Sequence, residues 1–176
     1  MYLIVLKSIV RCLLADFATG LFHFFVDQYG SMHGRFMKKS VNFLLLHHTA
    51  PHKIVAQSYW ELTGSVYKIA SVIFGVSLLF GVHWELLLFL LFCANGNIIH
   101  RWSHQRKSEA SFLVRNLQRF KIIQNKEHHN QHHNGAFNKN YCVMTNAMNP
   151  ILHRIRFWEF VIRNLKNLKI HPANGS

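Results

Sequence analysis

The longest apolar stretch of this sequence runs from Leu62 to Ile99 and reads LTGSVYKIASVIFGVSLLFGVHWELLLFLLFCANGNII. Lys68 lies near its start, and the segment GVHWE at 81–85 interrupts it near its middle. A helix needs about 20 apolar residues to cross the hydrocarbon core of a bilayer, and each half supplies nearly that number. The pattern predicts two transmembrane helices joined by a tight turn, with Lys68 near enough to a helix end for its amine to reach the headgroups.

A third crossing is predicted over residues 8–27, where apolar residues predominate although Arg11 and Asp16 interrupt them. No small-residue cleavage site follows residues 1–14, so we interpret this segment as a retained helix. The mixed and basic stretch 28–59 is expected to lie at the membrane surface.

Two later segments, 110–125 and 150–169, have apolar residues at helical spacing and basic residues on their other faces. Pro150 is the predicted first helical residue of the second segment, directly after Asn149. Both helices are expected in the membrane interface, although core helices of a soluble bundle would show the same pattern. The expected fold class is all-α: an integral-membrane helical bundle with about three transmembrane crossings plus interfacial amphipathic helices, in which residues 1–176 form a single domain.

The composition agrees with a membrane location. Half of the 176 residues are hydrophobic and only 15% are charged. The net charge of +13 is also typical of nucleic-acid binding, but nucleic-acid binders rarely carry long uncharged apolar runs, so we exclude that partner. The cysteines, Cys12, Cys93 and Cys142, are far apart, so neither a disulfide framework nor a zinc knuckle is predicted.

The 14 histidines are grouped rather than scattered. Residues four apart lie on one face of a helix, so histidines at this spacing can direct two donors to one point. Four groups have suitable spacing: His23 with Asp27, His47 with His48, His100 with His104, and the run HHNQHH over His128–His133. Imidazole suits iron, zinc and copper, and a carboxylate adds a harder ligand for iron. We interpret the isolated histidines as ordinary polar residues: His33, His52, His83, His153 and His171.

All four groups fall on one face of the membrane if the first crossing ends near Asp27 and the hairpin returns near His104. This face is predicted to be cytoplasmic because Lys and Arg favour that side and the turn at 81–85 has neither. The cations on it are Arg35, Lys38, Lys39, Lys53, Arg101, Arg106 and Lys107. Together the groups offer about ten donors, more than one tetrahedral metal can use, so we infer a dinuclear site.

Four stretches, in this order and spacing, resemble the Kua-type lipid desaturases, which include plasmanylethanolamine desaturases and a plastid enzyme acting on the palmitate of phosphatidylglycerol. They are ADFATGLFHFFVDQYG (15–30), HHTAP (47–51), IIHRWSH (98–104) and HHNQHHNGAFNKNYCVMTNAMNP (128–150), with Phe157 and Trp158 following. The resemblance spans most of the chain.

The resemblance implies which residues bind the metals. The implied ligands are His23, His47, His48, His100, His104, His129, His132 and His133, with Asp27 as a ligand or a close partner of the ligands and His128 as a further candidate. Tyr141 and Asn149 are expected to support the site. Arg101 and Arg106 are candidates for binding a headgroup phosphate.

The resemblance further implies a di-iron enzyme that introduces a double bond into an alkyl or acyl chain of a membrane phospholipid. It would use O2 and electrons from a ferredoxin or a small cytochrome. The lipid is not determined, because the sequence departs from the family pattern at Leu46, Gln57, Ser58, Ala136 and Phe137. A lipid hydroxylase, a non-redox membrane metal-binding or transport protein, and a non-catalytic interaction protein remain alternatives, and the oligomeric state is not predicted.

Overall fold

Over residues 2–30, 38–81, 83–134, 139–170 and 172, which the computed structural model describes, every regular element is helical. The helices follow one another as α1 (Tyr2–Tyr29), α2 (Lys38–Thr49), α3 (Lys53–Ala56), α4 (Tyr59–Ser77), the short 3-10 helix η1 (Leu78–Phe80), α5 (Trp84–His104), α6 (Phe112–Arg119), α7 (Lys126–His133), α8 (Met148–Arg154) and α9 (Phe157–Asn167). The predicted all-α fold class is confirmed.

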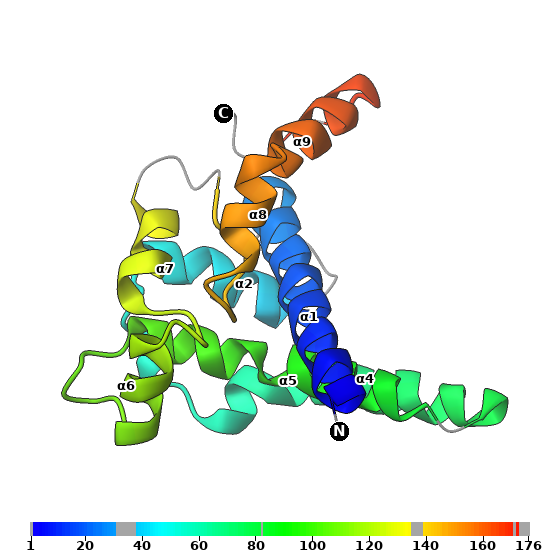
Figure 1. Cartoon of the computed structure of the whole chain (residues 1–176). Helices are drawn as coiled ribbons and strands as arrows, with labels where there is room; N and C mark the ends of the chain where they lie inside the picture. Colours follow the sequence, from blue (N-terminus) through cyan, green and yellow to red (C-terminus); the bar gives the residue numbers. More distant parts are fainter. Residues whose placement is uncertain (1, 31–37, 82, 135–138, 171, 173–176) are drawn as a thin grey trace.

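The predicted hairpin is formed by α4 and α5, and its turn projects away from the rest of the molecule (Figure 1). Helix α4 begins with a capping box, in which the Ser58 hydroxyl accepts from the Glu61 amide and the Glu61 carboxylate accepts from the Ser58 amide. The turn passes through Gly81, whose φ of 119° is a conformation that side-chain-bearing residues rarely adopt. Between the two helices, the Tyr59 hydroxyl donates to Asn95 Oδ1 over 2.9 Å.

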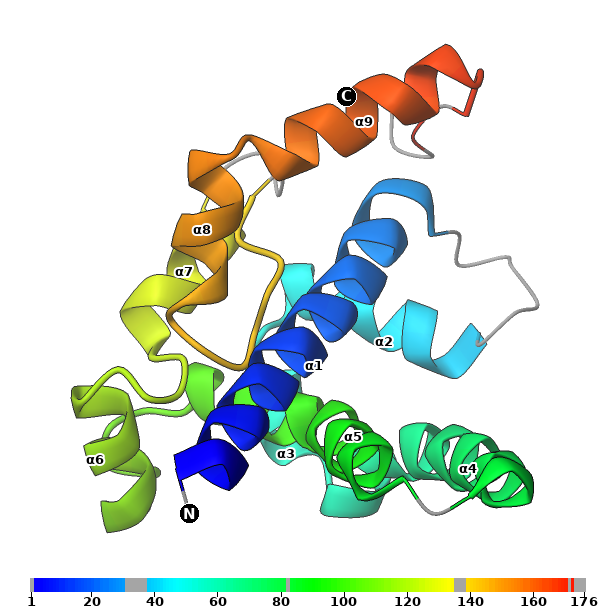
Figure 2. The ribbon, with the colours of Figure 1, turned by 45° about the vertical axis from the view of Figure 1, so that its right-hand side comes forward.

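Helix α1 packs on α5 and crosses it obliquely (Figures 1 and 2). Near their starts, Lys7 Nζ donates to Glu85 Oε1 over 2.9 Å. Further along, Gly96 permits a close approach, since a Cβ there would lie 3.4 Å from the Thr19 methyl group. The C-terminal ends of both helices therefore meet on one side of the molecule.

Two helical segments among the described residues are long and apolar enough to cross a membrane: Tyr2–Tyr29 and Tyr59–Phe80. Only 11% of the most apolar part of the second is buried within the protein, so its apolar side chains face outward. Helix α5 has 21 residues but is not in this set, because its second half carries polar residues such as Asn95, Asn97 and Arg101. Of the roughly three predicted crossings, α1 and α4 with η1 are supported by length and composition. The third, α5, is a helix as predicted but does not meet the same criterion.

The C-terminal part differs from the prediction of one helix starting at Pro150. Helix α8 begins two residues earlier, at Met148. The helical conformation is then interrupted at Arg156, whose φ of 53° lies in the left-handed region. Helix α9 then turns away from α8 towards the C-terminal end of α1 (Figure 2), where Trp158 stacks on Phe24 with ring centroids 4.9 Å apart. The break lets the apolar face of α9 pack on α1, which a straight helix from Pro150 would not do.

Candidate metal centre

Nine of the predicted ligands, from four helices, meet on the side where α1 and α5 end. They form two groups, and within each the candidate ligand atoms all lie within 4.8 Å of one another. The pentahistidine group consists of His47, His100, His104, His129 and His133. The mixed group consists of His23, Asp27, His48 and His132.

Helical spacing accounts for most of this convergence. His100 and His104 lie one turn apart on α5, and His129 and His133 lie one turn apart on α7. The start of α7 is defined by Asn125, whose side chain accepts from the His128 amide over 2.9 Å. On α2 the neighbours His47 and His48 point into different groups, and their ring centroids lie 4.4 Å apart. The two groups are therefore adjacent.

Three ring nitrogens of the pentahistidine group form a triangle that hydrogen bonds alone cannot satisfy. The Nε2 atoms of His100 and His129 are 3.0 Å apart, those of His129 and His104 are 2.9 Å apart, and those of His104 and His100 are 3.2 Å apart. Each nitrogen can be only a donor or an acceptor, so at least one pair must place two like groups against each other. A cation bound to all three lone pairs removes this conflict.

The mixed group is built around the carboxylate of Asp27, which is 7% exposed. Its Oδ1 lies 2.9 Å from His48 Nε2, and its Oδ2 lies 3.3 Å from His23 Nε2 and 3.2 Å from His132 Nε2. This group thus offers one negative charge, whereas the pentahistidine group offers none.

Backbone carbonyls orient three of the imidazoles. Nδ1 of His23 donates to the Tyr141 carbonyl over 3.1 Å, and Nδ1 of His132 donates to the Lys139 carbonyl over 2.7 Å. Nδ1 of His47 donates to the Leu44 carbonyl. A carbonyl can only accept, so each ring carries its proton on Nδ1 and directs the Nε2 lone pair into the site, as metal-binding histidines do.

Burial also favours the neutral form of His47 and His129. For His47 on α2 and His129 on α7, desolvation lowers the pKa well below the usual value, and neighbouring histidines lower it further. A neutral imidazole has the lone pair that a metal requires.

Sequence reasoning did not assign a role to Asp16, which is 0% exposed within α1. Its carboxylate accepts from the amides of Met144 and Thr145 over 2.8 and 2.9 Å and from the Thr145 hydroxyl over 2.7 Å. Asp16 thereby holds the segment 141–145, whose first carbonyl orients His23. The signal was an acidic residue inside a predicted crossing, a position that is costly unless it has a function.

Gly20 and Gln124 hold the same segment. A Cβ at Gly20 would lie 2.6 Å from Cys142 Sγ, so only glycine allows this approach to α1. The Gln124 side chain donates to the Cys142 carbonyl over 2.8 Å, and the Gln124 backbone NH donates to the Met144 carbonyl over 2.9 Å. The segment is fixed from several sides, although it has no regular secondary structure of its own.

The remaining candidate ligand, His128, lies outside both groups. Its Nε2 accepts from Asn149 Nδ2 over 3.1 Å, and Asn149 also binds the backbone of Cys142 in both directions. Tyr141 packs against the mixed group, with its ring centroid 5.3 Å from that of His132, and its hydroxyl accepts from Gln28 over 3.0 Å. Both predicted supporting residues are therefore next to the site.

The two arginines predicted to bind a headgroup phosphate lie in the last turn of α5 and just after the end of that helix. Arg101 is half-buried on α5 between the candidate ligands His100 and His104, and Arg106 is exposed beyond the end of that helix. Arg35, His33, Ala136, Phe137 and His171 lie outside the described residues, and so do the side chains of Lys38 and Lys39.

The donor set fits two metal ions. Nε2 of His47 is buried and has no hydrogen-bond partner in the described part of the chain. Two groups of four or more nitrogen and oxygen donors, without a thiolate, suit hard or borderline metals such as iron or zinc. The histidines are thus arranged as ligands rather than as a solvated polar loop.

The fold and site together define a helical protein with membrane-candidate helices and a buried polyhistidine site able to bind metal. A family model described as the lipid desaturase domain matches residues 12–170. The chain belongs to this family, whose members are oxidoreductases, and the resemblance noted in the sequence is confirmed.

Several curated relatives match over most of the chain. The chloroplastic fatty acid desaturase 4 of Arabidopsis thaliana is 25% identical over 154 residues, which cover 84% of this chain and 47% of the relative. The plasmanylethanolamine desaturase of Myxococcus xanthus is 27% identical, covering 89% and 58%, and plasmanylethanolamine desaturase 1 of Mus musculus is 27% identical, covering 89% and 62%. The chain thus spans about half the length of the plant relatives. No solved structure matches it.

Proposed function

We propose that this chain is a di-iron lipid desaturase that introduces a double bond into an alkyl or acyl chain of a membrane phospholipid. In the overall reaction two hydrogens leave adjacent methylenes, and O2 with two further electrons and two protons is reduced to two molecules of water. Family membership supports the reaction class. The triangle of Nε2 atoms in the pentahistidine group is the observation that carries the metal requirement.

Iron, when bound, supplies the activation of O2 and the oxidation of carbon–hydrogen bonds. The pentahistidine group would hold one ion with neutral donors only, and the mixed group would hold the other with Asp27 as its anionic ligand. We favour iron because this carboxylate adds a hard donor to the imidazoles, and because no cysteine of the described residues belongs to either group.

The chain's own residues provide orientation and exclusion of water. The backbone carbonyls of Leu44, Lys139 and Tyr141 fix three ligand rings before any metal binds. Tyr141 is 0% exposed and packs against the His132 ring of the mixed group, so solvent does not reach the group past this residue. A dry and rigid site is what selective oxidation of one methylene pair requires.

We also propose that the site faces the cytoplasm. Lys53, Arg101 and Arg106 are close along the chain to the candidate ligands His48, His100 and His104, whereas Lys7 near the start of α1 is paired with Glu85. We further propose that the electrons come from a separate ferredoxin or small cytochrome, as the resemblance to the lipid desaturases implies.

The test is to express the chain in a host and to compare its lipids by mass spectrometry with those of a host expressing a His132→Ala, His133→Ala double variant. The proposal predicts lipid species lighter by two hydrogens that are absent with the variant. Species that gain one oxygen would instead assign a hydroxylase. Unchanged lipids together with stoichiometric zinc would contradict both and assign a non-redox metal protein.

A further inference from the structure

Two hollows lie where α1, α8 and α9 meet, and they share two lining residues. One is lined by apolar side chains and the other also by charged ones, so together they are amphipathic. One has a volume near 360 Å³ and is lined by apolar side chains alone: besides the two shared residues, these are Val10, Leu13, Leu14, Phe17, Met148 and Leu152. The other, near 580 Å³, lies along the start of α9. Ile155 and Phe157 line both, so the two hollows are adjacent.

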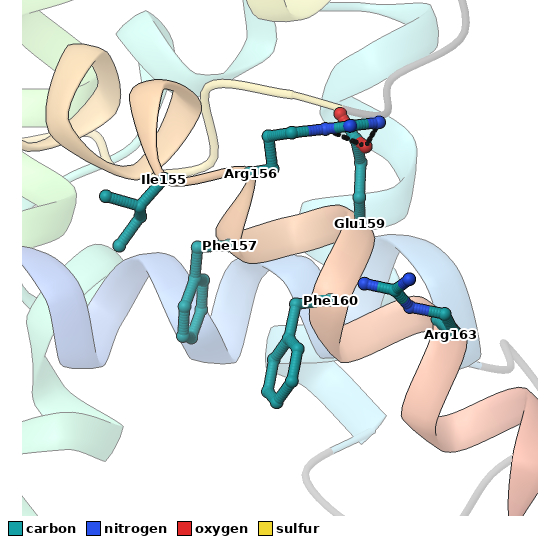
Figure 3. Close-up of a pocket in the computed structure, with 6 residues that line it drawn as sticks. All are labelled: Ile155, Arg156, Phe157, Glu159, Phe160 and Arg163. Atoms are coloured by element: carbon teal, nitrogen blue, oxygen red, sulfur yellow. Dashed lines mark hydrogen bonds and ion pairs between the residues drawn. The ribbon is translucent and has the colours of Figure 1, made fainter.

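The α9 hollow has a cationic end. Figure 3 shows the rings of Phe157 and Phe160 on one side of it, the Arg156–Glu159 pair on the other, and the Arg163 guanidinium between them. Arg156 Nε donates to Glu159 over 2.7 Å, so the charges of these two residues offset each other. No hydrogen bond or ion pair joins Arg163 to another described residue, although its charge acts on Glu159 one turn away. With two arginines and one glutamate, the lining keeps a net positive charge.

The apolar hollow does not open into the metal centre. Phe17, Met148 and Phe157, which line it, pack on a buried cluster that includes Phe24, Tyr141 and Trp158. Tyr141 and Trp158 have ring centroids 4.8 Å apart, and the Tyr141 ring also contacts the His132 ring, with centroids 5.3 Å apart. This buried cluster separates the apolar hollow from the candidate metal ligands. An acyl chain lying in the hollow would therefore not reach them.

The occupant must be apolar along α1 and anionic at Arg163. Helix α1 is one of the two candidate spans, so the apolar hollow would open to acyl chains rather than to water. A guanidinium binds phosphate oxygens in a bidentate manner, and it can do so while aromatic rings cover the adjoining apolar part of the ligand. We propose that the two hollows form a seat for one phospholipid outside the metal centre, with its phosphate at Arg163 and an acyl chain along α1.

The test is native mass spectrometry of the full chain, delipidated in detergent and titrated with phosphatidylglycerol, with diacylglycerol of the same chains, and with inorganic phosphate. We expect one phosphatidylglycerol to bind at least about 10-fold more tightly than diacylglycerol, which lacks the phosphate. Inorganic phosphate should not displace it, because the acyl chain contributes much of the binding.

Two variants probe the two ends of the seat. Arg163→Glu reverses the charge, and Leu14→Trp fills the apolar hollow; each should weaken binding about 10-fold or more. Their matched controls are Lys166→Glu on α9 and Ile9→Trp on α1, exposed residues that line neither hollow and should bind the lipid as the parent does. Thermal unfolding of all four variants checks that each is folded.

The seat is refuted if diacylglycerol binds as tightly as phosphatidylglycerol, if Arg163→Glu has no greater effect than Lys166→Glu, or if phosphate alone displaces the lipid. Metal content, measured on the same samples, should not change in any variant. Because binding is measured without turnover, an inactive protein that still binds one phospholipid would contradict the proposed function and leave the seat standing.

Discussion

The two ends of the α1–α5 pair both place polar groups between the helices, but they differ in burial. At one end the Lys7–Glu85 pair is 40% and 28% exposed, and water can replace either partner. At the other end His23 and His100 are 2% and 0% exposed, and seven further candidate ligands surround them. Polar groups buried without water need an internal counterpart, so only the second end requires bound cations. We call these the exposed end and the buried end.

The largest effect is expected from removing a ligand at the buried end. His100→Ala should lower desaturation by more than about 100-fold, because even partners behind the ligands change metal affinity or activity by 10–100-fold. The measurement is the ratio of unsaturated to saturated lipid in a host expressing the variant at the same level as the parent. His83→Ala, an exposed residue in the hairpin turn, is the matched control and should retain activity.

A smaller effect is expected when Asp16 is replaced, because it acts through the segment 141–145. In Asp16→Asn, the side-chain NH2 replaces an oxygen that accepts from the backbone NH of Met144 or Thr145, so one of these hydrogen bonds is lost. Because the segment 141–145 orients His23, metal affinity should fall about 10-fold. Metal retained during titration with a chelator measures this. Thr145→Ser keeps the hydroxyl and should behave as the parent. If Asp16→Asn lowers thermal stability but leaves metal retention unchanged, Asp16 supports the fold and not the site.

Acid should destabilise the metal-free protein at the buried end. Burial holds the pKa of His47 and His129 below the value of about 6.5 that they have in the unfolded chain. Between these two values the unfolded chain binds protons that the folded chain does not, so stability is present above pH 6.5 and falls as the pH decreases. Each group contributes up to about 1.4 kcal/mol per pH unit. Thermal unfolding of chelator-treated protein between pH 8 and pH 5 measures this, and a flat profile would contradict it.

The smallest effect is expected at the exposed end. Lys7→Ala removes one partner of a partly exposed ion pair and should cost less than about 1 kcal/mol. Desaturation and metal content should be those of the parent. A loss of metal in this variant would mean that the two ends are coupled and that the contrast between them is not valid.

The sequence predicted the parts of this structure that follow from periodicity. The hairpin could be predicted because its apolar halves match the length of a crossing, and the ligand pairs because His100/His104 and His129/His133 have helical spacing. The division into two groups could not be predicted, since His47 and His48 are adjacent in sequence but point to different groups. The break between α8 and α9 depends on the left-handed conformation of Arg156, which no local sequence pattern predicts. The hydrogen bonds of Asp16 to Met144 and Thr145 join residues more than 100 positions apart, so local spacing could not predict them either.

The number and kind of bound metals distinguish the account from its alternatives most directly. The full chain would be purified from iron-supplemented cells, and its iron, zinc and copper would be measured per chain, beside Asp27→Asn, which removes the only anionic ligand of the mixed group. We expect two iron ions per chain in the parent and one in the variant. A single zinc ion, or no bound metal in a folded and active protein, would contradict it.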